Sequence, residues 1–517
     1  MPEHLMLQRF IKKILSARVY DCAIETPLDH ARLLSKRLGN EVWLKREDLQ
    51  PVFSFKIRGA YNKLAQLSEA ERQRGVITAS AGNHAQGVAL AAQQLGIRAI
   101  IVMPQTTPEI KVNSVRSRGA EVVLIGDAFD EAAAHAAKLV AELQLTYIPP
   151  YDDEDVIAGQ GTIAVEILRQ FKGLPDVIFT CVGGGGLTAG VVAYIKYLHP
   201  HIKVIGVEPA DSNCLYAALE AGQPVTLAEV GIFADGVAVK RIGDIPWSIC
   251  KDHIDEVILV STDEICAAIK DIFEDTRSIA EPAGALAVAG MKRYVTREKA
   301  VGQRLVATVS GANMNFERLR YVSERTEIGE AREAILAVQI PEKPGSFKQL
   351  INTLGGHNIT EFNYRYALDD RTTDDAAKAQ IFLGVQVSRG AEETSDLMGA
   401  LSNGGYTVID LTSNEMARMH VRHMVGGHSP ALLNELVYRF EFPERPGALL
   451  KFLMSFGTRW NISMFHYRNH GAAFGRVLVG AQVPAEDKVD FETMLDTIGF
   501  RYWEETDNPA YGLFLGK

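Results

Sequence analysis

The stretch Val177-Ile178-Phe179-Thr180-Cys181-Val182-Gly183-Gly184-Gly185-Gly186-Leu187-Thr188-Ala189-Gly190 decides the fold class of this chain. Its first six residues are mostly apolar and do not alternate with charged ones, which predicts a strand buried on both faces. The four glycines predict a turn, and the apolar residues that follow predict a helix. A buried strand followed directly by a helix is typical of a parallel sheet that helices cover on both faces.

The same alternation of strand and helix continues on both sides of this stretch. Apolar runs that predict strands lie at 75–78, 99–103, 121–125, 204–207 and 305–309, and helical patterns lie at 84–95, 110–118 and 130–143. We therefore predict an α/β domain over residues 1–322, with open parallel sheets and flanking helices. Ligands of such sheets bind at the carboxyl ends of the strands.

Composition describes an ordinary globular protein. Of the 517 residues, 47% are apolar and 23% are charged, and the formal net charge is −10. No clustered basic face and no membrane segment is apparent, so we expect neither nucleic acid nor a membrane as a partner. The five cysteines form no Cys-x-x-Cys pair. We therefore expect reduced thiols, no metal site and a cytoplasmic protein.

The glycine run predicts an anion site. Four successive glycines, Gly183 to Gly186, allow the backbone amides to fold around a phosphate, and no Gly-Lys-Ser or Gly-Lys-Thr follows as in a nucleotide P-loop. Gly184, Gly186 and Ala189 also fit the dinucleotide fingerprint, with Glu208 where a ribose-binding acid would stand. An NAD-dependent dehydrogenase is therefore an alternative, although that fingerprint should lie in the first strand-helix-strand unit.

Other polar groups also follow predicted strands. Lys56 lies between an aromatic and an apolar residue, and a desolvated lysine can become a nucleophile, whereas a lysine taken alone is more often a solvated surface residue. The small-residue loop 80–87 opens a helix whose amides suit a carboxylate, unless Ser80 or Asn83 is only a helix cap. Ser310 ends another strand. Together these groups favour pyridoxal phosphate and an amino acid as ligands.

In these motifs the chain resembles the biosynthetic threonine deaminases (threonine ammonia-lyases), which are fold-type II pyridoxal phosphate enzymes. The matching residues lie at 54–60, 80–84, 183–187, 235–239, 281–285 and 310–313. The resemblance implies that Lys56 carries the cofactor as a Schiff base and is the catalytic base. The other cofactor contacts that it implies are with Phe55 at the ring face, Asn83 at the phenolic oxygen, Ser310 at the ring nitrogen, Gly183, Gly184, Gly185, Gly186 and Leu187 at the phosphate, and Gly236 and Glu281. The substrate contacts that it implies are with Ser80, Gly82, Asn83 and His84.

The resemblance also implies the reaction. It is the deamination of L-threonine to 2-oxobutanoate and ammonia, the first step of isoleucine biosynthesis. Serine differs from threonine by one methyl group, which is worth only about 1–3 kcal/mol in a pocket, so we expect some serine turnover. A β-replacing or racemising enzyme of the same fold that acts on serine is the nearest alternative.

The C-terminal third contains an internal repeat. Residues 340–345 (Ile-Pro-Glu-Lys-Pro-Gly) recur as 442–447 (Phe-Pro-Glu-Arg-Pro-Gly). We predict a linker at 323–333 and two copies of a βαββαβ unit at 334–425 and 426–517. They resemble the ACT-like regulatory domains of the same family, which implies a homotetramer that isoleucine inhibits and valine activates. The effector contacts placed by this resemblance are Phe347, Tyr364, Arg365, Tyr467 and Arg468. The tyrosines as packing residues and the arginines as surface charges are equally consistent with the sequence.

Overall fold

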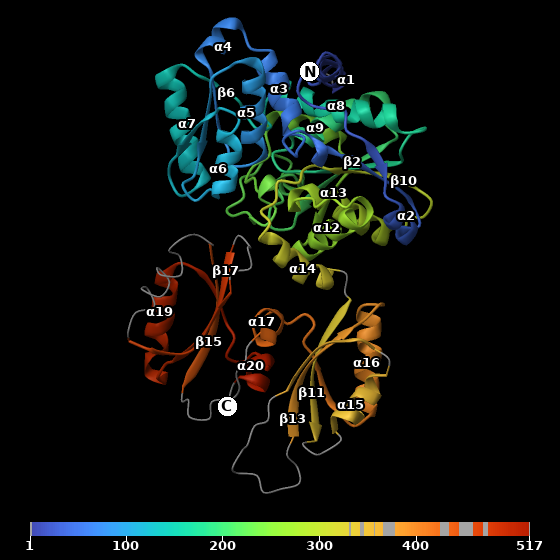
Figure 1. Ribbon diagram of the computed structural model, residues 1–517, viewed down its shortest axis with the longest axis vertical. Coiled ribbons are helices and arrows are strands. Elements are labelled where there is room, and N and C mark those ends of the chain that lie inside the picture. The colour runs from blue at the N-terminus through green and yellow to red at the C-terminus, as the bar shows by residue number, and fades with distance from the viewer. Residues whose placement is uncertain are drawn as a thin grey trace. The chain divides into compact units, whose positions relative to one another are not determined.

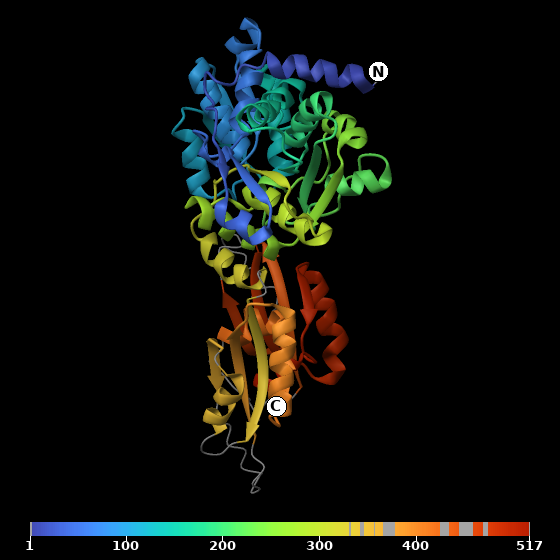
Figure 2. The ribbon, with the colours of Figure 1, turned by 90° about the vertical axis from the view of Figure 1, so that its right-hand side faces the viewer.

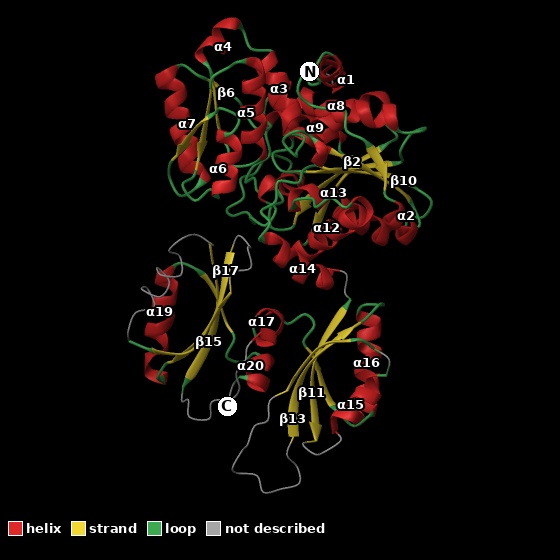
Figure 3. Cartoon of the chain, in the orientation of Figure 1, coloured by secondary structure: helices red, strands yellow, loops and turns green. Residues whose placement is uncertain are grey.

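We describe the protein from a computed structural model, which places residues 3–329, 332–341, 346–355, 357–364, 378–423, 434–443, 459–468 and 474–515. The chain forms two compact units, Met1–Thr326 and Glu327–Lys517. Figure 1 shows their elements in chain order, and Figure 3 shows them by secondary structure. No helix within the described ranges combines the length and the apolar character needed to cross a bilayer.

The larger sheet of the first unit has six strands in the order β1-β2-β10-β7-β8-β9. These strands are β1 (Leu28–His30), β2 (Glu41–Arg46), β7 (Val177–Cys181), β8 (Lys203–Pro209), β9 (Glu256–Val260) and β10 (Arg304–Val309). The pairs from β2 to β9 are parallel, whereas β1 pairs antiparallel with β2. The predicted parallel sheet is therefore confirmed. The antiparallel edge strand was not predicted, because three residues are too few to show a period.

Helices cover both faces of this sheet (Figure 1). They are α1 (Glu3–Leu15), α2 (Arg32–Leu38), α8 (Glu154–Gln170), α9 (Gly186–Leu198), α10 (Cys214–Ala221), α11 (Asp244–His253), α12 (Thr262–Thr276), α13 (Pro282–Glu298) and α14 (Arg318–Gly329). Figure 2 shows α1 along one side of the unit. The apolar residues of the sheet and of these helices form one continuous buried core.

The smaller sheet of the first unit has four parallel strands in the order β5-β4-β3-β6. They are β3 (Val76–Ala79), β4 (Ala99–Met103), β5 (Glu121–Leu124) and β6 (Thr146–Tyr147). The helices in this part of the chain are α3 (Lys56–Ala65), α4 (Glu69–Arg74), α5 (Asn83–Leu95), α6 (Glu109–Arg116) and α7 (Phe129–Leu143). The predicted strands thus belong to two separate sheets with separate apolar cores.

Local sequence signals set several helix ends. The side chain of Ser261 accepts a hydrogen bond from the amide of Glu264 in a capping box before α12. Pro282 opens α13 at a position where its missing amide hydrogen removes no helical bond. Gly96 ends α5 with φ 65°, a left-handed conformation that glycine adopts without strain. Sequence and local structure therefore agree at these boundaries.

The second unit contains two four-stranded antiparallel sheets with the same order of strands, β12-β13-β11-β14 and β16-β17-β15-β18. The first copy comprises β11 (Glu333–Pro341), α15 (Ser346–Leu354), β12 (Ile359–Tyr364), β13 (Lys378–Gln386), α16 (Ala391–Asn403) and β14 (Thr407–Asp410). The second comprises β15 (Glu435–Pro443), β16 (Asn461–Arg468), β17 (Phe474–Gln482), α19 (Lys488–Ile498) and β18 (Arg501–Glu504). The predicted α+β repeat is confirmed, and the first copy shows the full βαββαβ order.

The repeat extends beyond the strands. Helix α17 (Glu415–Met419) follows β14, and α20 (Pro509–Phe514) follows β18. Their cap residues Asn414 and Asn508 are equivalent, and Nδ2 of Asn414 donates to Oδ1 of Asn508 at 3.1 Å. The two copies therefore contact each other through equivalent cap residues.

The boundary between the two units falls inside α14, so residues 323–329 of the predicted linker are helical. The charged composition of this stretch indicated an irregular connection, but α14 buries Tyr321 and Val322. These contacts stabilise a helix where charge alone predicted none. The limits at 322, 334 and 425 stay predictions.

Candidate active site

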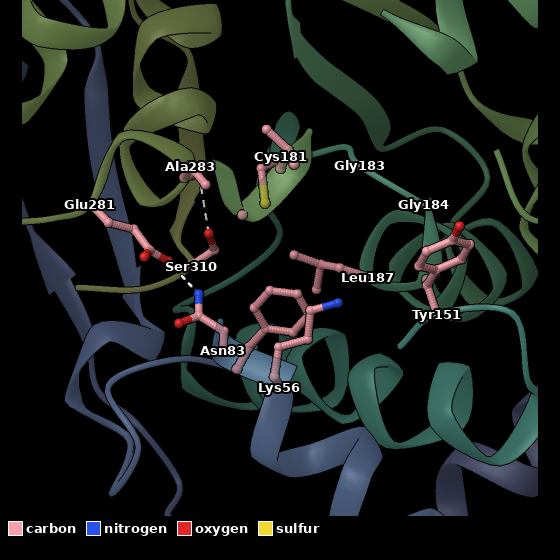
Figure 4. A pocket seen from close by; sticks show the side chains of 15 residues that line it. Lys56, Asn83, Tyr151, Cys181, Gly183, Gly184, Leu187, Glu281, Ala283 and Ser310 are labelled. Atoms are coloured by element: carbon pink, nitrogen blue, oxygen red, sulfur yellow. Dashed lines mark hydrogen bonds between the residues drawn. The ribbon is translucent and has the colours of Figure 1, made fainter. Parts of the chain in front are cut away.

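One cavity gathers all the residues that were predicted to contact the cofactor (Figure 4). Its predicted lining residues are Phe55, Lys56, Asn83, Gly183, Gly184, Gly185, Gly186, Leu187, Gly236, Glu281 and Ser310. Tyr151, Cys181, Val237 and Ala283 also line it and were not predicted as site residues. Tyr151 follows β6, a strand of two residues that is too short to recognise from the sequence. Cys181 and Val237 lie beside predicted residues.

Lys56 opens α3 and extends its side chain into the cavity (Figure 4). Its Nζ donates to the carbonyl oxygen of Pro150 at 2.9 Å. Burial lowers the pKa of this amine to about 8, although the neighbouring Cys181 and Glu281 act in the opposite direction. An amine with this pKa is partly uncharged near neutral pH, which a nucleophile or a general base requires.

A buried network of charges holds the first turn of α3, which carries Lys56. The guanidinium of Arg58 bonds Glu47 through Nε at 2.7 Å and Glu166 through Nη1 at 2.6 Å. Lys45 bonds Glu166 at 2.6 Å, and all four of these side chains are fully buried. Since buried charges are tolerated only when they are paired, loss of one partner of this network would destabilise the start of α3 beside Lys56.

The glycine turn lies between β7 and α9. A Cβ atom at Gly184 would overlap the ring of Tyr151, and one at Gly183 would lie 2.9 Å from Cα of Val237. Gly185 has φ 89°, which other residues rarely adopt. Helix α9 begins at Gly186, so the turn places the first amides and the positive end of the helix at the cavity. This arrangement fits a phosphate group.

Asn83 and Glu281 lie side by side in the cavity wall (Figure 4). Nδ2 of Asn83 donates to Oε1 of Glu281 at 2.5 Å, and Oδ1 of Asn83 accepts from Nδ2 of Asn313 at 2.7 Å. Burial raises the pKa of Glu281 to about 7, and the negative charge of Asp235 acts in the same direction. The carboxyl of Glu281 can therefore exchange a proton with a ligand near neutral pH.

Ser310 lies directly after β10. Its hydroxyl donates to the carbonyl oxygen of Ala283 at 3.2 Å and lies near the thiol of Cys181. Burial raises the pKa of Cys181 to about 11, so this thiol stays neutral. Ser310 thus offers a neutral hydroxyl, rather than a carboxylate, to a ring nitrogen.

The predicted substrate loop is only partly gathered at the cavity. Of its residues, Asn83 lines the cavity, whereas Ser80, Gly82 and His84 do not. Nε2 of His84 lies 2.9 Å from the carbonyl oxygen of Ile148, so this nitrogen carries the proton and donates. Burial lowers the pKa of His84 to about 3, which keeps the ring neutral. The neutral imidazole has no second N–H to donate to a substrate carboxylate. The groups of this loop that can bind a carboxylate are therefore its backbone amides.

The predicted effector residues lie in the second unit. Phe347 belongs to α15, Tyr364 ends β12, and Tyr467 and Arg468 belong to β16. Arg365 lies outside the described residues. Their role stays a prediction.

Glu208 has a structural role instead of the one that the dinucleotide fingerprint suggested. Its carboxylate accepts hydrogen bonds from the amides of Leu215 and Tyr216 at 2.9 Å each, at the start of α10. The side chain is fully buried. It is therefore not placed to bind a ribose.

Comparison with known proteins agrees with this geometry. Residues 19–311 match the family of pyridoxal-phosphate dependent enzymes, and residues 324–421 and 427–515 match the C-terminal regulatory domain of threonine dehydratase. The chain is 56% identical over 509 residues to the biosynthetic L-threonine dehydratase of Burkholderia multivorans, covering 98% of this chain and 99% of that protein. It belongs to the biosynthetic threonine dehydratases.

Further relatives support this membership. The biosynthetic L-threonine dehydratase of Escherichia coli is 54% identical over 506 residues, covering 98% of this chain and 97% of that protein. The structure of the processed form of threonine deaminase isoform 2 from Solanum lycopersicum superposes with a TM-score of 0.61 at 50% identity, over 62% of this chain and 88% of that one. The predicted family, fold class, cofactor and regulatory domain are confirmed. The NAD-dependent dehydrogenase alternative falls outside this family.

The cavity of this threonine dehydratase fits pyridoxal phosphate. A Cβ atom at Gly183 or Gly184 would collide with Val237 or Tyr151 of the cavity wall, so the turn keeps this shape only with glycines, and the amine of Lys56 is held in the same cavity. Asn83 and Ser310 offer polar groups from two other sides (Figure 4). Lysine, phosphate turn and ring partners are the set that this cofactor requires.

Proposed function

We propose that this enzyme deaminates L-threonine to 2-oxobutanoate and ammonia, with Lys56 as the residue that bonds the cofactor and moves the substrate proton. The observation that carries the proposal is the Lys56 amine, whose pKa is lowered to about 8 in the cavity that the glycine turn lines. When bound, pyridoxal phosphate supplies a conjugated ring that accepts electrons from the substrate Cα–H bond.

The remaining roles belong to residues of the chain. Nζ of Lys56 takes the proton from the substrate Cα, and the amides of Gly183 to Gly186 with Leu187 hold the phosphate. Asn83 bonds the phenolic oxygen, and Phe55 packs on the ring. Because the hydroxyl of Ser310 is neutral, it does not stabilise a positive ring nitrogen as a carboxylate would. This favours prompt loss of the substrate β-hydroxyl over racemisation or transamination.

The test is an assay for 2-oxobutanoate together with a visible spectrum of the purified protein before and after borohydride. Lys56→Ala should abolish both turnover and the absorbance of the lysine-bound cofactor. Lys36→Ala, a change at an exposed lysine of α2, should alter neither. Normal activity in Lys56→Ala would refute the assignment.

L-Serine should also be turned over, because its smaller side chain loses only about 1–3 kcal/mol of pocket contact. Formation of pyruvate from serine, without D-serine and without incorporation of an added thiol, separates deamination from racemisation and β-replacement. Either of the latter as the main reaction would favour the alternative within the same fold.

We further propose that isoleucine inhibits and valine activates through the second unit, near Phe347, Tyr364, Arg365, Tyr467 and Arg468, in a cytoplasmic homotetramer. The match to a threonine dehydratase regulatory domain supports this proposal. Deleting residues 334–517 should leave a catalytic part that isoleucine does not inhibit. Continued inhibition of a folded truncated enzyme would place the sensor elsewhere.

A further inference from the structure

Helix α14 connects the active site to the regulatory part along the chain. Ser310 and Asn313 precede it, and its last residues after Thr326 belong to the second unit. The first regulatory strand, β11, begins at Glu333. A helix transmits a displacement of one end to the other as a rigid element. The contacts of α14 within the first unit therefore lie on the covalent route from the regulatory unit.

One face of α14 contacts the loop that ends at the cavity. Nη1 of Arg318 lies 3.3 Å from the carbonyl oxygen of Phe233 and 3.5 Å from Oδ1 of Asp235. Tyr321, one turn further on the same face, packs its ring on Phe233 with centroids 5.4 Å apart. Arg318 and Tyr321 thus hold the same short segment from consecutive turns.

This segment continues directly into the cavity wall. Gly236 and Val237 line the cavity, and a Cβ atom at Gly236 would lie 3.8 Å from Oε1 of Glu281 and 3.9 Å from Nδ2 of Asn83. A shift of Asp235 therefore displaces the neighbouring Gly236, which lies in the cavity wall near Glu281 and Asn83.

A second cation reaches the same carboxylate from the smaller sheet's side. Lys111 of α6 bonds Oδ2 of Asp235 at 2.7 Å. Asp235 therefore connects α6, which packs with the smaller sheet, to Arg318 of α14. Both cations favour the charged form of Asp235 and contact different oxygens, so the carboxylate is held from two elements at once.

We propose that Arg318 is a positioning residue that holds the 233–236 loop against the cofactor cavity, and that the regulatory unit alters threonine binding through this contact. The second half rests on the isoleucine regulation proposed above. If Arg318 formed only an ordinary partly exposed ion pair, its removal would change little, since such pairs contribute about 0–1 kcal/mol.

The experiment compares full-length holoenzymes carrying Arg318→Gln and Arg320→Gln, the same change at an exposed arginine two residues further along α14. We expect Arg318→Gln to raise the KM for threonine several-fold with a smaller change in kcat. The isoleucine concentration for half inhibition should rise about tenfold, whereas the isoleucine Kd measured by calorimetry without threonine stays near that of the unchanged enzyme. Arg320→Gln should match the unchanged enzyme in all four values.

Two further variants decide the remaining cases. Arg318→Lys keeps the positive charge, so its KM for threonine and its sensitivity to isoleucine should lie between those of Arg318→Gln and the unchanged enzyme. Lys111→Gln should raise the KM for threonine without loss of isoleucine inhibition. If Arg318→Gln behaves like Arg320→Gln, or if Arg318→Gln is unstable and Arg318→Lys and Lys111→Gln leave KM unchanged, the proposal is wrong. If isoleucine does not bind the unchanged enzyme, the effector assignment is wrong. The KM values then test only whether Arg318 holds the 233–236 loop against the cavity.

Discussion

Asn313 donates a hydrogen bond from Nδ2 to Oδ1 of Asn83 at 2.7 Å. The same nitrogen donates to the carbonyl oxygen of Val52, also at 2.7 Å. Because Oδ1 of Asn83 is engaged in this way, its Nδ2 must face Glu281 and the cavity. Asn313 therefore sets which end of the Asn83 amide a ligand meets.

Asn313→Asp should reverse this orientation, since a carboxylate cannot donate to Oδ1 of Asn83. A mispaired buried hydrogen bond costs about 1–3 kcal/mol, so we expect kcat/KM for threonine to fall about ten- to a hundredfold. Asn315→Asp, the same change two residues further along the chain, should have little effect because Asn315 bonds exposed Glu317. Equal losses in both variants would contradict a specific role for Asn313.

Residues that end long strands could be located from the sequence. Ser310 follows β10 and the glycine run follows β7, and both strands show clear apolar runs. The cavity positions that were missed lack such a signal. Tyr151 follows a strand of only two residues, and Ala283 lies within the matched motif 281–285, of which only Glu281 was assigned to the site. The roles of the gathered residues stay predictions until tested.

Glu281 makes stability depend on pH. Its pKa is raised to about 7 in the folded protein, against about 4.3 when unfolded. Between these values the folded state binds more protons than the unfolded state, so stability falls as pH rises from about 4 to 7 and stays low above it. Glu281→Gln should remove this loss, and its thermal midpoint should exceed that of the unchanged enzyme more at pH 8 than at pH 5.

The matched control is Glu220→Gln at an exposed glutamate of α10. Its difference from the unchanged enzyme should be the same at both pH values. A difference for Glu281→Gln that is the same at both pH values would mean that the carboxyl is charged throughout this range.

Gly184→Ala tests the phosphate turn. The added methyl group would overlap the ring of Tyr151, so the turn or the ring must move. We expect weaker retention of pyridoxal phosphate during dialysis, measured by visible absorbance. The double variant Gly184→Ala with Tyr151→Ala should recover part of it. Gly399→Ala, where a Cβ atom meets nothing within 4 Å, is the control. Full retention in Gly184→Ala would show that the turn is not limited by Tyr151.

Two features of the fold depend on partners that are distant in the chain and carry no local signal. Arg58 meets Glu166 across 108 positions, and Asn414 meets Asn508 across 94. The sequence shows a charged or polar residue at each position, but solvated residues have the same types. The repeat motif indicated two copies, whereas only the structure shows that they contact each other through equivalent cap residues.

Arg58→Met should be strongly destabilising, because it leaves Glu47 and Glu166 buried with only Lys45 as a cation. Breaking a buried pair costs about 3–5 kcal/mol. Arg98→Met is the matched control: Arg98 pairs with Glu121 at the surface, with side chains 51% and 54% exposed, so its loss should cost under about 1 kcal/mol. Urea unfolding followed by the visible absorbance of the cofactor reports the first unit alone. Comparable midpoints for the two variants would mean that the Arg58 network does not hold Lys56 in place.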